Sequence, residues 1–198
     1  MTKPNAPSCE RNQQAILNVL KDIIKPTDKH LLEIGSGTGQ HAIFMSPFFP
    51  QLQWHTSDVI DNHEGINQWI LESKCGNVSP PVFYQSGMTE FPNIQPDVIY
   101  TANTLHIMSW KNVQNLIQQF GENLKQGTQV VIYGPFNYNH KFTSESNAKF
   151  DVWLKEQEPH RGIRDFENIN QLMQNVGIAL KQDIAMPANN RILHFSKN

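Results

Sequence analysis

The stretch Glu33-Ile34-Gly35-Ser36-Gly37-Thr38-Gly39 decides the fold that we expect for this chain. It ends a short apolar run, residues 30–34, that is typical of a buried strand, and the residues from 40 to 48 begin a predicted helix. Alternating glycines let the backbone pass close to a nucleotide or its ribose, and the start of the following helix offers N–H groups without partners. The stretch therefore predicts a nucleotide-binding turn between a strand and a helix.

The spacing of the glycines distinguishes two classes of cofactor. A dinucleotide fingerprint, G-x-G-x-x-G, needs its third glycine at position 40, which is Gln40 here. The third glycine is instead Gly39, and Glu33 lies two residues before the first glycine. This E-x-G-x-G-x-G spacing resembles the S-adenosylmethionine loop of class I methyltransferases. The alternative is a tight turn that binds nothing. Three glycines argue against it, because each glycine costs backbone entropy on folding.

Strands and helices alternate on both sides of this turn. The order predicts an α/β fold with a doubly wound, mainly parallel sheet covered by helices on both faces. The expected strands are residues 30–34, 52–56, 82–84, 97–101 and 129–133, and the expected helices include 65–73 and 110–124. Two further strand-like runs, 178–185 and 191–195, flank a turn signal, so the sheet should finish with an antiparallel strand.

Length and composition exclude several classes of protein. The 198 residues suit a single domain, residues 1–198, with an N-terminal helix at about residues 8–24. The net charge of −2 without a basic cluster argues against a nucleic-acid partner. No apolar run is long enough to span a membrane, no signal peptide is visible, and two cysteines make no disulfide framework, so we expect a cytoplasmic protein.

Polar residues follow the other predicted strands, at the edge of the sheet where ligands of open α/β folds bind. Asp58 can accept both ribose hydroxyls of an adenosine, which both cofactor classes need. The next such segment, Gln85-Ser86-Gly87-Met88-Thr89, has no acid for the adenine, so backbone N–H groups and the Met88 side chain would contact it. Asn103 is placed to face the methionine part of the cofactor. The cofactor candidates are Glu33, Gly35, Ser36, Gly37, Gly39, Asp58, Gly87, Met88 and Asn103.

Two histidines are candidates for a general base, should the acceptor have to lose a proton. His106 is the first choice, because the ordinary pKa of histidine lies near working pH, and His140 is the second. The alternative for His106 is a buried, hydrogen-bonded core residue. No pair of histidines has metal-ligand spacing, so no metal site is expected.

Residues 134–165 form an insertion of 32 residues where about 2–6 are usual. Ser144 can cap a helix within it, and its place after a strand end is typical of a lid. We expect Arg11 and Arg164 to line a closed pocket, one of them pairing with an anionic or strongly polar group of a small acceptor. Structural salt bridges of both arginines are the alternative. The acceptor-binding candidates are Arg11, Asn12, Tyr133, Asn147 and Arg164.

Motifs spread over nearly the whole chain resemble the methyltransferase-like protein 26 family. Besides the glycine loop they are Glu10-Arg11-Asn12, Asn103-Thr104-Leu105-His106-Ile107 with Trp110, Tyr133-Gly134-Pro135-Phe136, Phe142-Thr143, Ser146-Asn147, Phe150-Asp151, Gly162-Ile163-Arg164-Asp165 and Met186-Pro187-Ala188-Asn189-Asn190. The resemblance implies a class I methyltransferase (Rossmann-like) fold, a seven-stranded sheet in the order 3-2-1-4-5-7-6, and S-adenosylmethionine as cofactor. It implies no particular acceptor.

The sequence thus predicts an S-adenosylmethionine-dependent methyltransferase of a small molecule, working as a monomer or homodimer. Two alternatives stay open. One is an NAD(P)-dependent oxidoreductase, against which stand Gln40 and the absence of an obvious Tyr-x-x-x-Lys couple. The other is a non-catalytic module that binds S-adenosylmethionine through the same loop.

Overall fold

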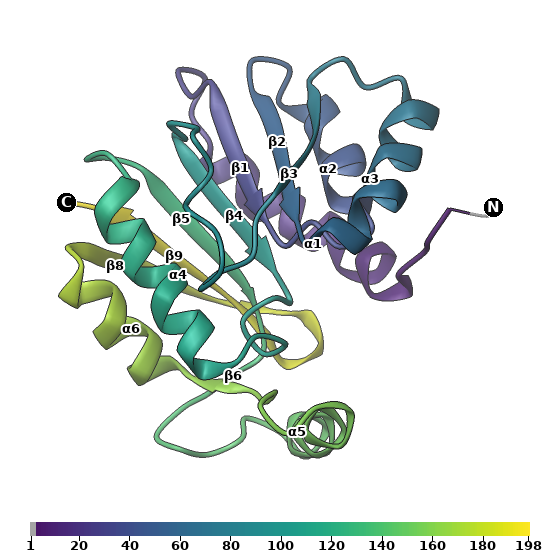
Figure 1. Ribbon diagram of the computed structural model, residues 1–198. Helices are drawn as coiled ribbons and strands as arrows, with labels where there is room; N and C mark the ends of the chain where they lie inside the picture. Colours follow the sequence, from purple (N-terminus) through teal and green to yellow (C-terminus); the bar gives the residue numbers. More distant parts are fainter. Residues whose placement is uncertain (1–2) are drawn as a thin grey trace. The chain divides into compact units, whose positions relative to one another are not determined.

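The computed structural model describes residues 3–198, which divide into two compact units. Unit 1 comprises residues 3–85 and 89–101, and unit 2 comprises residues 86–88 and 102–198. Together they carry one seven-stranded sheet in the order β3-β2-β1-β4-β5-β9-β8 (Figure 1). This order is the one that the resemblance implied, once the short strands β6 and β7 are set aside. The predicted doubly wound α/β sheet is confirmed.

Unit 1 holds the parallel part of the sheet. Its strands are β1 (His30–Ile34), β2 (Gln53–Asp58), β3 (Val78–Phe83) and β4 (Val98–Ala102). Its helices are α1 (Pro7–Ile23), α2 (Gln40–Met45) and α3 (Ile60–Ser73), with the short 3-10 turn η1 (Ser46–Phe48) after α2. Strand β1 is buried along all but its first residue, as expected of an apolar strand between two neighbours of a parallel sheet.

Two elements of unit 1 begin earlier than the sequence predicts. Strand β3 begins at Val78 and contains Pro80 and Pro81, which an edge strand tolerates because one side of it needs no ladder hydrogen bonds. Helix α3 begins at Ile60 and continues through Gly65. A Cβ at Gly65 would lie 2.4 Å from Cγ of Pro4, so this glycine makes room for the N-terminal segment rather than starting the helix.

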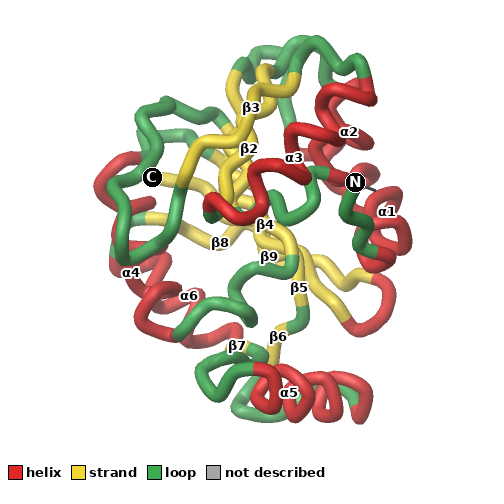
Figure 2. The backbone as a smooth tube through the Cα atoms, turned by 45° about the vertical axis from the view of Figure 1, so that its right-hand side comes forward, coloured by secondary structure: helices red, strands yellow, loops and turns green. Residues whose placement is uncertain are grey.

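Unit 2 holds the antiparallel part of the sheet. Strand β9 (Asn190–Lys197) runs antiparallel to both β5 (Gln129–Gly134) and β8 (Ile178–Met186). The helices α4 (Trp110–Asn123) and α6 (Phe166–Asn175) belong to this unit. They lie side by side (Figure 2). The predicted turn before β9 is the 3-10 turn η2 (Pro187–Asn189).

The insertion forms a small structure of its own within unit 2. Its strands β6 (Phe136–Asn137) and β7 (Arg164–Asp165) pair in parallel, and helix α5 (Glu145–Gln157) lies between them in the sequence. The side chain of Ser144 accepts from the backbone N–H of Asn147 and caps α5. No helix among residues 3–198 is long and apolar enough to cross a membrane.

Candidate functional site

Gly37, in the glycine loop after β1, borders open space. Gly37 has a φ of +58°, and a Cβ built there would meet no atom within 4 Å. Gly39 differs, because its Cβ would lie 3.2 Å from Cα of Ile66 in α3. A side chain at Gly39 would therefore press on α3, whereas Gly37 leaves an uncovered stretch of backbone that a ligand can approach.

Asp58, the last residue of β2, reaches this loop. Its Oδ2 accepts from the backbone N–H of Gly37 at 2.6 Å, and its Oδ1 accepts from Val59 N and from Asn62 Nδ2. The side chain is largely buried, with 8% of the residue exposed. The carboxylate of Asp58 and the backbone of Gly37, which the cofactor hypothesis expects to contact the same ligand, thus lie next to each other.

Glu33 lies beneath the loop. Only 2% of the residue is exposed, and Nε1 of Trp54 donates to its Oε2 at 3.0 Å. Burial raises the pKa of this carboxyl to about 7, against the opposing effect of hydrogen bonds from Trp54 and Ser36, and the charge of Asp58 raises it further. Ser36, also buried, accepts from the backbone N–H of Ser57. Both residues support the loop from inside unit 1.

Gln40 ties the N-terminal segment to the loop. Its Oε1 accepts from the backbone N–H of Ala6 at 2.6 Å and from Oγ1 of Thr38 at 2.8 Å, and its Nε2 donates to Oδ1 of Asn5 at 2.6 Å. The residue is 4% exposed. Sequence reasoning used Gln40 only as a mismatch to a dinucleotide fingerprint, because no local pattern reveals a partner 35 positions away.

The acceptor candidates of α1 have different surroundings. Oδ1 of Asn12 lies 2.8 Å from Nε2 of His41. Because that oxygen can only accept, Nε2 of His41 carries the proton and Nδ1 accepts from the hydroxyl of Tyr100 at 3.1 Å. Burial lowers the pKa of His41 to about 4, so the ring is neutral. Asn12 therefore joins α1 to α2, and Arg11 is exposed on α1.

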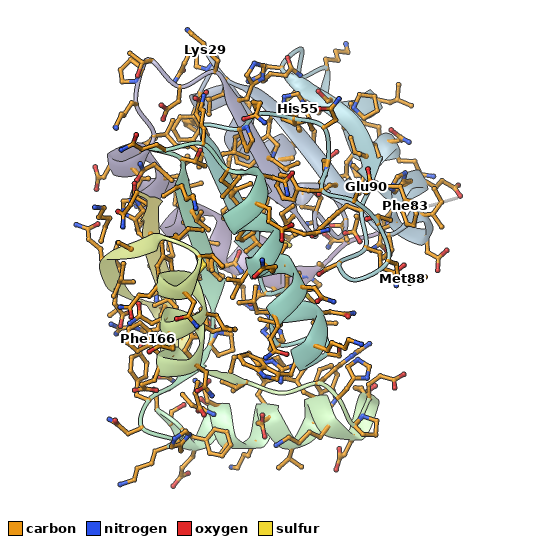
Figure 3. The ribbon with its side chains drawn as sticks, turned by 60° about the vertical axis from the view of Figure 1, so that its left-hand side comes forward. Lys29, His55, Phe83, Met88, Glu90 and Phe166 are labelled. Carbon is orange, nitrogen blue, oxygen red and sulfur yellow. The ribbon has the colours of Figure 1, made fainter. Side chains whose placement is uncertain are left out.

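The adenine candidates lie in the segment 86–88 of unit 2. A Cβ at Gly87 would lie 2.8 Å from Nδ2 of Asn115 and 2.9 Å from Oδ1 of Asn112, so this glycine lets the segment pack on α4. Met88 is 75% exposed and is labelled in Figure 3.

Two further candidates converge at the end of β5 in unit 2. A Cβ at Gly134 would lie 3.8 Å from Nδ1 of His106 and 3.9 Å from Oδ1 of Asn103. The backbone N–H of Asn103, which has a φ of 57°, donates to the carbonyl of Tyr133 at 2.9 Å. Tyr133 itself is buried in β5. The missing side chain of Gly134 leaves space in front of both polar atoms.

His106 is a buried histidine without hydrogen bonds to its ring. It is 6% exposed, and among the described residues neither ring nitrogen has a partner. Phe150 meets the ring edge-on, with the centroids 5.3 Å apart. Burial lowers the pKa of His106 to about 4, and the charges of Arg164 and Arg161 lower it further. The argument that this base has a pKa near working pH is therefore wrong, because it used the value of a solvated imidazole.

The guanidinium of Arg164 donates hydrogen bonds to backbone carbonyls. Its Nε donates to the carbonyl of Leu105 at 3.1 Å, and its Nη2 donates to the carbonyls of Met108 and His160. These contacts are hydrogen bonds to backbone carbonyls and include no salt bridge, and the ligand role that the sequence suggested for Arg164 stays a prediction. They hold the chain after β4 against the segment before β7.

His140 and Asn147 lie elsewhere in the insertion. Nδ1 of His140 is 2.6 Å from Oδ2 of Asp165, and its side chain is 79% exposed. Nδ2 of Asn147 donates to Oγ1 of Thr143 and to the carbonyl of Asn189. Asn147 thereby joins two walls of a cavity of about 400 Å³, a volume that suits a small molecule. The cavity is lined by Tyr138, Thr143, Ala185, Met186, Asn189, Asn190 and Arg191.

Comparisons with known proteins support the fold. A family described as "Protein of unknown function (DUF938)" matches residues 3–197. An O-methyltransferase family 2 protein from Planctomyces limnophilus, solved with apigenin, has a TM-score of 0.82 at 14% identity, covering 94% of this chain and 56% of that one. An O-methyltransferase family protein from Burkholderia thailandensis has a TM-score of 0.79 at 15% identity, with coverages of 94% and 56%.

A third solved structure is that of CalO1, a methyltransferase in calicheamicin biosynthesis, in its SAH-bound form. Its TM-score is 0.75 at 13% identity, and the match covers 94% of this chain and 54% of that one. The present chain thus spans little more than half the length of these three structures. At such identities the likeness shows a shared Rossmann-like methyltransferase fold.

Proposed function

The chain belongs to the DUF938 family, and from this premise we propose that it is an S-adenosylmethionine-dependent methyltransferase of a small molecule. The observation that carries the proposal is the contact between Asp58 and the open glycine of the loop, Gly37. We also infer membership of the methyltransferase-like protein 26 family, which the motifs of the chain resemble. The fold shared with solved methyltransferases supports both inferences.

The residues of unit 1 fit this cofactor. Asp58 presents a carboxylate for the ribose hydroxyls, and the backbone at Gly37 is uncovered. Glu33 and Ser36 hold the loop from below. S-adenosylmethionine supplies a methyl group activated by a sulfonium, so that positioning an acceptor can provide much of the catalysis.

The same region disfavours a dinucleotide. Gln40 fills the position of the third fingerprint glycine, which in dinucleotide-binding folds allows close packing of helix and strand. Its side-chain amide forms hydrogen bonds with Asn5, Ala6 and Thr38. Gln40 therefore counts against the oxidoreductase alternative, although Asp58 suits both classes of cofactor.

The acceptor that we propose is a small molecule bound by polar residues of unit 2. Nδ1 of His106 and Oδ1 of Asn103 both lie beside Gly134. With a pKa of about 4, His106 is a weak base near neutral pH and would chiefly orient the acceptor through a hydrogen bond. The net charge of −2 gives no support for a nucleic-acid acceptor.

Calorimetry and thermal unfolding with four cofactors test the proposal. S-adenosylhomocysteine (SAH) and S-adenosylmethionine should bind and stabilise the protein, by about 2.7 kcal/mol at one hundred times Kd, and NAD and NADP should not. Binding of NAD without binding of SAH would overturn it. Conversion of S-adenosylmethionine to SAH in the presence of fractionated small-molecule extract distinguishes an enzyme from a binding module.

A further inference from the structure

The cavity of about 400 Å³ in unit 2 has walls from the insertion and from the hairpin of β8 and β9. Arg191, which lines it, pairs with Gly134, the last residue of β5. Nδ1 of His106 and Oδ1 of Asn103 lie beside the same glycine. Open α/β sheets bind their ligands at the carboxyl ends of the strands. The cavity therefore lies at the ligand edge of the sheet.

One wall of the cavity is the turn η2, whose backbone has an unfavourable conformation. Ala188 and Asn189 both have a φ of 57°, which residues other than glycine rarely adopt. The carbonyl of Asn189 accepts from Nδ2 of the buried Asn147 at 3.1 Å. The carbonyl of Ala188 accepts from Nδ2 of Asn190 at 3.3 Å. Strained backbone persists where neighbours hold it in this way, and it is frequent at ligand-binding sites.

The charges at the cavity cancel. Among the described residues that line it, Arg191 alone carries a charge. Its Nε donates to Oδ1 of Asp183 at 2.8 Å, and the hydroxyl of Tyr138 donates to Oδ2 of the same carboxylate at 2.7 Å. A charged ligand would lose its hydration here and find no opposite charge without a partner. The cavity therefore favours an uncharged ligand.

The lining still offers hydrogen bonds of both kinds. Oγ1 of Thr143 accepts from Nδ2 of Asn147, so its hydroxyl can donate to a ligand. Nδ2 of Asn190 donates to the carbonyls of the turn, and its Oδ1 has no hydrogen bond among the described residues. Ala185 and Met186 add apolar surface. A matching ligand both donates and accepts hydrogen bonds and has an apolar part.

We propose that this cavity binds a small uncharged molecule with an apolar body and a group that both donates and accepts hydrogen bonds, such as an aromatic carboxamide. Oδ1 of Asn190 accepts from the ligand, the hydroxyl of Thr143 donates to it, and Met186 contacts its apolar body. Binding to the cavity stands by itself. The identification of the ligand as the methyl acceptor rests on the proposed function.

Nuclear magnetic resonance of the full chain, with ¹³C in the methionine methyl groups, tests the proposal. Benzamide, benzoate and benzamidine have nearly the same shape and are neutral, anionic and cationic at about pH 7. The Met186 resonance, assigned with the variant Met186→Leu, should shift to saturation with benzamide. Benzoate and benzamidine should bind at least about tenfold more weakly, because the cavity offers them no free counter-charge. The methyl group of Met88, outside the cavity, should stay in place.

Variants of β8 test the cavity and its charge balance separately. Ala185→Leu places a larger side chain in the lining and should abolish the benzamide response, whereas Ala179→Leu makes the same change outside the lining and should keep it. Asp183→Asn removes the charge that balances Arg191 and keeps the shape of the side chain. Benzoate should then gain about tenfold in affinity, because the guanidinium is left without an opposite charge.

The outcomes separate this proposal from that of the cofactor. A saturable benzamide response that Ala185→Leu abolishes supports the cavity as a binding site. An unchanged Met186 resonance, equal affinities of the three probes, or an equal benzamide response from folded Ala185→Leu overturns it. If Ala185→Leu does not fold, the benzoate affinity of Asp183→Asn gives the answer, and an unchanged value overturns the proposal. The titration contains no cofactor, and SAH binding by the wild-type protein is measured separately, so failure of one proposal is distinguished from failure of the other.

Discussion

Replacement of Gly37 by valine separates the role of the loop in binding from its role in folding. At a φ of +58° a β-branched residue is strained, and we expect a loss of about 1–3 kcal/mol in the free energy of unfolding. No atom of the protein lies within 4 Å of the new Cβ, so the Cβ itself meets no steric overlap. The backbone N–H that donates to Asp58 is kept. The added side chain therefore occupies the space proposed for the cofactor.

Gly127→Val is the matched control. Gly127 has a φ of +88°, and a Cβ there also meets nothing within 4 Å, but it lies between α4 and β5, away from the glycine loop in the sequence. Both variants should lower Tm by about 2–4 °C for each kcal/mol lost. Only Gly37→Val should lose SAH binding in calorimetry. Equal SAH affinity in the two folded variants would refute the reasoning and leave Gly37 as a turn residue.

Three other substitutions test neighbouring features. Asp58→Asn should weaken SAH binding at least about tenfold in calorimetry, since a hydrogen bond to a charged group contributes about 1.5–3 kcal/mol, and the exposed Asp61→Asn should not. The pKa of Glu33 is raised to about 7, so its stabilising contribution is complete below about pH 4.5 and is lost as the pH rises towards 7. In the wild-type protein the free energy of unfolding, measured with urea, should therefore be about 3 kcal/mol lower at pH 8 than at pH 5 because of Glu33, and Glu33→Gln should remove this difference. The same difference in the variant would contradict a raised pKa of Glu33. Gly65→Val places its Cβ 2.4 Å from Pro4, so amide exchange of the N-terminal segment should accelerate, and unaltered exchange counts against the contact.

Local patterns predicted the elements that depend on neighbours in the sequence. The turn from β1 into α2 was readable because glycine is needed within a few residues to reverse the chain. The cap of α5 was readable for the same reason, since Ser144 bonds to an N–H three residues away. Strand β3 was harder, because Pro80 and Pro81 argue against a central strand and only the sheet order reveals that β3 is at an edge.

Residue roles that depend on distant partners could not be predicted in this way. Arg164 resembled a ligand-binding arginine, and the carbonyls that occupy it belong to residues up to 59 positions away. His106 was named as a candidate from its place after a strand, but burial and two arginines set its pKa. The Nε of Arg161 is buried and has no hydrogen-bond partner. No pattern in the sequence predicts this, because the lack of a partner results from packing.

The division between the two kinds of information follows from the range of the forces involved. Backbone sterics and hydrophobic periodicity act over a few residues, so the chain order alone specified the α/β class, the glycine turn and the antiparallel terminal hairpin. Desolvation and hydrogen bonding depend on every atom nearby, whatever its position in the sequence. Folding therefore decided that Gln40 anchors the N-terminal segment, that Asp58 meets Gly37, and that His106 is neutral.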